Sequence, residues 1–192
     1  MSSSNIFERL PPITADKMND EQRQAADALA AGPRGGVKGP FIALLRSPEL
    51  MNRLQRVGEY LRFDSSLDTR ARELAILLVA RRWSQQFEWS VHYPLAARAG
   101  IRGAVLDALA EGRRPAGLTS SEETVYDFCD ELFRTAGVSD STYEHAIEQF
   151  GEKGVVDLLG IIGYFTTVSL ILNVAHTPAG GSEVTPLPAY PL

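Results

Sequence analysis

The chain has 192 residues, of which 44% are hydrophobic and 22% charged, a balance typical of an ordinary globular domain and unlike that of a disordered or collagen-like chain. Its formal net charge is −5, and no basic run capable of neutralising a phosphate backbone is present, so we expect no nucleic-acid partner. The single cysteine, Cys129, excludes an intramolecular disulfide and a CxxC redox pair. We expect one domain over residues 1–192, working in a reducing cytoplasm.

Apolar residues recur every three or four positions along most of the chain, which predicts an all-α fold of about seven to eight helices. The first helix is expected over residues 15–31, because Thr14 precedes it and a loop rich in glycine and proline follows it as far as Pro40. Pro48 opens another helix, which the apolar pattern extends to about Phe63.

Two helices joined by a short connection are predicted in the middle of the chain. Asp68 is expected to cap the first of them, which ends near Trp83, and Ser84 is expected to cap the second, over residues 85–99. Because the connection is short, the second helix should fold back along the first.

Further helices are predicted over residues 101–111, over residues 119–136, and from Ser139 to an interruption at Gly151. The apolar segment 158–175 is near the lower length limit of a membrane span, but it contains threonine, serine and asparagine and lacks flanking positive clusters. We interpret it as a buried central helix or a subunit interface, and expect no membrane partner. The proline-rich residues 177–192 should form an extended arm on this subunit or on a neighbour.

A glutamate and a histidine stand four residues apart on the predicted helix 85–99. Because an α-helix advances by about 100° per residue, Gln85, Glu88 and His92 share one face, and Glu73 on the preceding helix is placed to join them. A carboxylate and an imidazole held in a partly apolar cleft suit proton transfer near neutral pH. The same spacing also fits an exposed ion pair that stabilises a helix by only a few tenths of a kcal/mol.

Aromatic residues concentrate beside this group. We expect Trp89 to pack in the core and either Trp83 or Phe87 to form a pocket wall. No second histidine lies at metal-binding spacing, so neither a metal nor another cofactor is predicted. His176 follows Asp157 at the same interval that separates His92 from Glu73, but we assign it no chemistry.

The core motif, residues 70–101, RARELAILLVARRWSQQFEWSVHYPLAARAGI, resembles the signature of the carboxymuconolactone decarboxylase and alkylhydroperoxidase D-like superfamily. Redox members of this superfamily have a glutamate, then a CxxC pair, then a histidine four positions after the second cysteine. Glu73 matches that glutamate and His92 that histidine, whereas Gln85 and Glu88 stand where the cysteines would be. The similarity includes the segments GPFIALLRSPEL and EYLRF and covers residues 35–112 well.

The resemblance implies an alkylhydroperoxidase D-like helical bundle that assembles as a trimer or hexamer, with active sites close to the subunit interfaces. It also implies a cofactor-independent lyase that acts on a small carboxylated lactone or a related compound, as in the degradation of aromatic compounds. In such an enzyme His92 would be the acid or base, Glu88 its partner or the proton donor, and Glu73 the residue that orients the imidazole.

Three further residues, Gln85, Trp83 and Arg70, are expected to contact the substrate. Arg70 or Arg82 would hold its carboxylate, unless each has only a surface role. Two alternatives remain open: a peroxidase-like family member whose activity is unrelated to peroxide, because Gln85 and Glu88 cannot do thiol chemistry, and a non-catalytic oligomeric protein that binds a small molecule.

Overall fold

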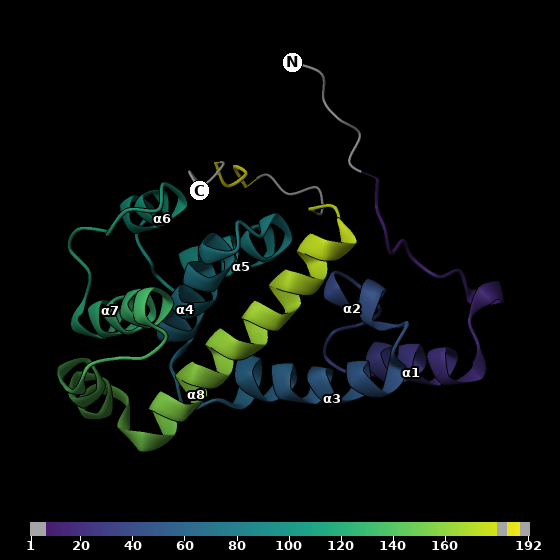
Figure 1. Cartoon of the computed structure of the whole chain (residues 1–192), viewed down its shortest axis with the longest axis horizontal. Helices are drawn as coiled ribbons and strands as arrows, with labels where there is room; N and C mark the ends of the chain where they lie inside the picture. The colour runs from purple at the N-terminus through teal and green to yellow at the C-terminus, as the bar shows by residue number, and fades with distance from the viewer. Residues whose placement is uncertain (1–6, 180–183, 189–192) are drawn as a thin grey trace, which may run out of the picture.

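The computed structural model describes residues 7–179 and 184–188. In this part of the chain it has eight α-helices and no strand, which confirms the predicted all-α class (Figure 1). The helices are α1 (Asp20–Ala31), α2 (Pro40–Leu44), α3 (Pro48–Glu59), α4 (Thr69–Arg82), α5 (Gln86–Arg98), α6 (Gly103–Ala110), α7 (Ser120–Thr135) and α8 (Asp140–Ala175). A single 3₁₀ turn, η1 (Ala15–Lys17), precedes α1, and a π-helical turn, η2 (Tyr60–Asp64), extends α3.

Helix α4 is the centre of the fold, with α5, α7 and α8 packed against it. Its middle is a continuous apolar run, and Leu74, Ile76, Leu77 and Val79 are all fully buried although they point in different directions around the helix axis. A helix that is apolar on every side has to be surrounded by other helices. A second, smaller cluster of buried residues joins α1, α2 and α3 on the other side of α8 (Figure 1).

Helix α8 runs diagonally across the molecule (Figure 1). Among the described helices it is the one long and apolar enough to cross a membrane, and 56% of its most apolar 18-residue window is buried inside the protein. One side packs on α4 and α7, whereas Val156, Leu159, Leu170 and Val174 are exposed. Gly151 has φ 68° and ψ 174°, so the helical path is broken there, as the sequence predicted.

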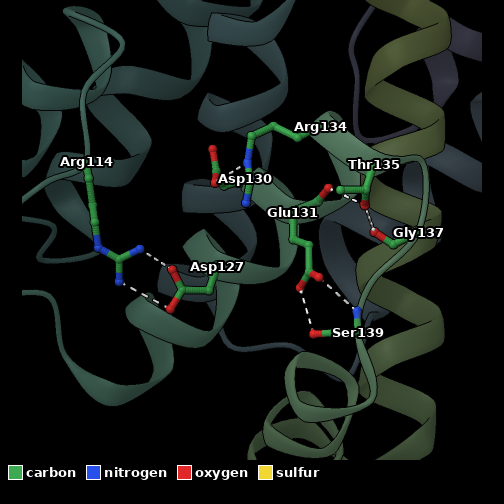
Figure 2. A network of polar contacts seen from close by, with 8 residues as sticks. All are labelled: Arg114, Asp127, Asp130, Glu131, Arg134, Thr135, Gly137 and Ser139. Atoms are coloured by element: carbon green, nitrogen blue, oxygen red, sulfur yellow. Dashed lines mark hydrogen bonds and ion pairs between the residues drawn. The ribbon is translucent and has the colours of Figure 1, made fainter.

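The connection between α7 and α8 is held by polar contacts (Figure 2). The Glu131 carboxylate accepts hydrogen bonds from the backbone amide of Ser139 at 3.0 Å and from its hydroxyl at 3.2 Å. Ser139 in turn caps α8. The hydroxyl of Thr135 donates to the carbonyl of Gly137. The contacts of Glu131 and Thr135 fix the start of α8 relative to the end of α7, whereas Arg114, which pairs with Asp127, joins the preceding loop to the first half of α7.

Two predicted helix starts were wrong. Residues 15–17 form only the isolated turn η1, and α1 begins after Asn19, because Asn19 and Gln22 form a reciprocal capping box that Thr14 does not provide. Ser84 does not cap α5. It adopts a left-handed conformation with φ 48°, and the cap is Gln85, whose side-chain oxygen accepts hydrogen bonds from two backbone amides of the first turn.

The described part of the C-terminal arm lies on this chain. Leu187 is buried, and its backbone amide and carbonyl pair with the side-chain amide of Gln86 at 2.9 and 3.0 Å. Arg81 donates to the carbonyl of Pro188 at 2.8 Å. Residues 180–183 and 189–192 of the predicted arm lie outside the described residues. The arm therefore docks at the start of α5, the helix that carries Glu88 and His92.

Candidate active site

His92 is held between two carboxylates. Its Nδ1 lies 2.7 Å from Oε2 of Glu73 on α4, and its Nε2 lies 3.5 Å from Oε2 of Glu88 on the same helix, α5. The exposed fractions of the Glu73, Glu88 and His92 residues are 4%, 5% and 1%. The edge of the Phe165 ring from α8 meets the imidazole at a centroid distance of 5.2 Å. The structure thus brings together the three residues that the sequence singled out for acid–base chemistry.

The start of α5 sets this geometry. The side-chain oxygen of Gln85 accepts from the backbone amides of Phe87 and Glu88, and its amide nitrogen donates to Asn173 on α8 at 3.0 Å. Asn173 donates to the carbonyl of Trp83 at 2.9 Å. The buried Gln85 therefore anchors the first turn of α5 to α8. Its side-chain oxygen already accepts two hydrogen bonds, so it cannot accept another from a substrate.

The environment of His92 favours its charged form. Burial alone would lower the pKa of the imidazole, but the hydrogen bonds and negative charges of Glu73 and Glu88 outweigh burial and raise this pKa above its ordinary value. Because the raised pKa favours the imidazolium and Glu73 holds Nδ1, His92 can deliver a proton from Nε2.

The raised pKa predicts a pH-dependent contribution to folding. Because the imidazolium is more stable in the folded state, this contribution is complete below the unfolded pKa of about 6.5 and is lost as the pH rises through the raised folded value. The cost of His92→Gln in urea unfolding should therefore be larger at about pH 5.5 than at about pH 8.5. His145→Gln, at an exposed position on α8, is the control, and an equal cost of His92→Gln at both pH values would contradict the expectation.

A cavity of about 300 Å³ opens beside this group, between the loop that precedes α2, the turn η2, α5 and α8. Glu88 and His92 contribute its acidic and imidazole groups. Most of the other lining residues are aromatic or cationic, namely Phe41, Phe63, Phe87, Tyr164, Phe165, Arg34, Lys38 and Arg62. An apolar enclosure with a few convergent charged groups is the usual form of a small-molecule site.

Arg34 and Tyr164 meet in this cavity at Gly58 of α3, which has no side chain. A Cβ atom at Gly58 would lie within 3 Å of the Tyr164 hydroxyl and of Nη2 of Arg34, so both groups pack directly on the glycine. The guanidinium also lies over the ring of Phe41, 4.7 Å from its centroid. Burial raises the pKa of Tyr164, although the charge of Arg34 partly offsets this, and the phenol stays a hydrogen-bond donor.

The buried part of Arg34 has donors to spare. Its Nε and Nη2 atoms are inaccessible to solvent and make no hydrogen bond within the described residues. Burial lowers the pKa of this guanidinium, against the effect of Glu88, yet an arginine stays charged under all ordinary conditions. A buried cation with free donors is costly unless an anion completes its hydrogen bonds. The cavity is therefore suited to a ligand that carries a carboxylate or another oxyanion.

The turn η2 places Arg62 and Phe63 in the cavity wall. Asp157 on α8 clamps both ends of this segment, because its carboxylate accepts from the Tyr60 hydroxyl at 2.9 Å and from the amide and hydroxyl of Ser66 at 2.8 and 2.7 Å. π-Helical turns in proteins are frequent at functional sites.

The residues predicted to contact substrate lie elsewhere. Trp83 packs against the main core and donates from Nε1 to the Thr166 hydroxyl at 3.2 Å. Arg70 pairs with Glu122 on α7 at 2.7 Å. Arg82 stacks over Phe133. The side chains of Trp83, Arg70 and Arg82 are therefore all outside the lining of the cavity. Of the aromatic residues, Phe87 forms a cavity wall, as one of the two alternatives held, and Trp89 is buried in the core.

The sequence interpretation missed four polar cavity residues, namely Arg34, Lys38, Arg62 and Tyr164. The first two lie in the loop before α2, which sequence reasoning treated only as a connection. A signal was present for the others, since Arg62 lies in the motif segment EYLRF, and Tyr164 is a polar aromatic residue in the mainly apolar segment 158–175. No group of three or more histidine, cysteine, aspartate or glutamate residues placed to hold a metal ion occurs in the described part of the chain.

Part of this site lies in a segment that matches a known protein family. Residues 48–131 match the carboxymuconolactone decarboxylase family, and this segment contains Glu73, Glu88 and His92 but not Arg34 or Tyr164. No curated protein matches the chain in sequence.

A similar solved structure is the alkylhydroperoxidase AhpD core of an uncharacterized peroxidase-related protein from Ralstonia eutropha JMP134. The two chains are 16% identical, with a TM-score of 0.71 over 90% of this chain and 92% of that one, which shows a shared fold. The chain is therefore similar to the carboxymuconolactone decarboxylase family over residues 48–131 and shares the alkylhydroperoxidase D-like fold, with a single cysteine and hence no CxxC pair.

Proposed function

We propose that the chain is a cofactor-independent lyase that uses acid–base chemistry on a small carboxylated ring compound, such as a lactone. The observation that carries this proposal is the buried His92, which lies between Glu73 and Glu88 at the wall of a cavity that also holds unpaired donors of Arg34. Similarity to the family supports the reaction class, and the positive side chains of the cavity support an anionic substrate.

The proposed reaction has two steps. Cleavage of the bond between the ring and its carboxylate releases carbon dioxide and leaves the electron pair of that bond in a conjugated enolate. The imidazolium of His92 then delivers the proton from Nε2 to carbon, either directly or through Glu88 at 3.5 Å, while Glu73 holds Nδ1 at 2.7 Å. Arg34 would stabilise the enolate oxygen or a second carboxylate of the substrate.

The direct test is the release of carbon dioxide from a carboxylated muconolactone by the purified protein, with the ring product identified by mass spectrometry. Turnover that disappears when the protein is omitted and saturates with substrate is the expected result. Saturable binding of the lactone without any carbon dioxide release would instead support the non-catalytic binding protein.

Thiol peroxidase activity is not expected. Cys129 is fully buried on α7, and burial raises the pKa of its thiol, which disfavours the reactive thiolate near neutral pH. The wild type and Cys129→Ala should therefore both fail to reduce an organic hydroperoxide in a dithiothreitol-coupled assay, and they should be equal in lyase turnover. Alanine is preferable to serine here, because a buried hydroxyl without a partner costs about 1–3 kcal/mol. Hydroperoxide reduction that is lost in Cys129→Ala would contradict this assignment.

We also propose that the chain assembles with itself as a trimer or hexamer, through the exposed apolar face of α8. Val156 and Val174 are 66% and 61% exposed near the two ends of its apolar part. Sedimentation equilibrium should give three or six times the 21.0 kDa of one chain. A double variant with lysine at both valines should dissociate, whereas Leu50→Lys, at an exposed apolar position on α3, should not. A wild-type monomer at micromolar concentration would refute the proposal.

A further inference from the structure

A second cavity lies beside Glu73, the carboxylate that holds Nδ1 of His92. Its volume is about 460 Å³, and it is lined by Arg62, Arg72, Glu73 and Arg98 together with Thr69 and apolar groups. The side chains come from η2, from the first turns of α4 and from the last turn of α5. Arg62 and Phe63 line both cavities, so the turn η2 forms the wall that they share.

The charges in this second cavity are unbalanced. Three guanidinium groups line it, and Glu73 is the one carboxylate among its lining residues. One oxygen of Glu73 is already held by His92 at 2.7 Å, and the other is 4.0 Å from Nε of Arg72, beyond a normal hydrogen bond.

Among the described residues, Arg72 lacks a hydrogen-bond acceptor for part of its guanidinium group. Its side chain is only 13% exposed, and its Nε atom is buried without a hydrogen bond in the described part of the chain. Its Nη2 atom donates to the hydroxyl of Thr69 at 3.1 Å, which leaves the positive charge without a carboxylate in hydrogen-bond contact. An oxyanion would supply the missing acceptor, because the planar guanidinium binds carboxylate and phosphate groups through two parallel hydrogen bonds.

We propose that the second cavity is a binding site for the oxyanion group, carboxylate or phosphate, of a small molecule, held by Arg72 and Arg98 with Arg62 at the shared wall. The site is separate from the first cavity, and its occupancy does not depend on the reaction proposed above. An anion bound there would lie beside Glu73, the carboxylate that orients His92. The two cavities would then be coupled through the Glu73–His92 pair, because Glu73 lines the second cavity and His92 lines the first.

The test uses inorganic phosphate and acetate as probes of the isotope-labelled full chain, followed by the NMR signals of backbone amides. Thr69 and Ala99 report on the second cavity, and Val91 reports on the first. We expect saturable shifts at Thr69 and Ala99 with millimolar affinity for at least one probe. The tighter probe identifies whether the natural ligand carries phosphate or carboxylate.

Variants assign the site. Arg72→Gln should raise the dissociation constant measured at Thr69 and Ala99 by about tenfold or more. Arg98 is exposed, so Arg98→Gln should fold normally, and it should also raise this dissociation constant. Arg34→Gln, in the first cavity, should leave it within about twofold. Absent shifts at Thr69 and Ala99, shifts that persist in both Arg72→Gln and Arg98→Gln, or shifts abolished by Arg34→Gln would overturn the proposal. A lack of lyase activity would not affect it.

Discussion

Replacing His92 by glutamine is expected to lower the turnover of the carboxylated substrate by about two or more orders of magnitude, the usual contribution of a positioned acid or base. Glutamine can still hydrogen bond to Glu73, which lies 2.7 Å from the imidazole in the wild type, but it cannot carry or transfer a proton. Glu88→Gln should have a comparable effect, because it removes the carboxylate that faces Nε2 inside the cavity. The measurement is kcat for carbon dioxide release under saturating substrate.

A matched control for this loss is Glu122→Gln. Glu122 is also a buried glutamate, but it pairs with Arg70 away from the cavity, so its replacement should lower stability and leave kcat essentially unchanged. Circular dichroism of each variant checks that it is folded. Full turnover in both His92→Gln and Glu88→Gln would show that the acid–base assignment is wrong.

Replacing Arg34 by glutamine should raise KM for an anionic substrate by about ten- to a hundredfold, because a hydrogen bond to a charged group is worth about 1.5–3 kcal/mol. Its buried Nε and Nη2 atoms make no hydrogen bond in the described residues, so a substrate carboxylate in the proposed reaction would supply an acceptor for them. If Arg34 instead stabilises charge that develops during the reaction, the loss will appear in kcat, and the ratio of the two effects distinguishes these roles.

Arg70→Gln is the informative comparison for Arg34→Gln. The sequence motif contains Arg70, whereas the structure pairs it with Glu122 outside the cavity lining. We expect KM to stay within about twofold of the wild type in Arg70→Gln. A large rise in KM for Arg70→Gln, with none for Arg34→Gln, would show that Arg70 binds the substrate carboxylate and that the assignment to Arg34 is wrong.

Local patterns in the sequence predicted most of the helices and the catalytic candidates. The spacing of Glu88 and His92 fixes them on one face of any helix, and the short link after Trp83 forces α5 back along α4 to Glu73. Where the prediction failed, two local signals competed. Ser84 is a common capping residue, but the chain turns there in a left-handed conformation, and the longer side chain of Gln85 reaches the amides instead.

No local signal in the sequence indicated that Arg34 and Tyr164 would meet in the cavity. Arg34 is brought there by a loop, Tyr164 by a helix more than a hundred residues later in the chain, and their contact depends on the missing side chain of Gly58. Contacts of this kind follow from how α3 and α8 pack, which one sequence does not specify through periodicity. Gln85 illustrates the opposite error, since its position on the predicted face was consistent with substrate contact but its amide is used by the backbone and Asn173.

Because η2 is a π-helical turn, the number of residues in Tyr60–Asp64 is as important for the shape of the two cavities as the identity of those residues. A π-helical turn contains one more residue than the α-helical turn that it replaces, so deletion of a single residue within Tyr60–Asp64 would restore ordinary helical winding. The helical side chains after the deletion, as far as Asp64, would then rotate by about 100° about the helix axis. Arg62 and Phe63 would leave the wall of both cavities, and Ser66 would lose its register with Asp157. Insertions and deletions should therefore be tolerated in the loop between α6 and α7 but not in η2, even when every side chain that lines the cavities is retained.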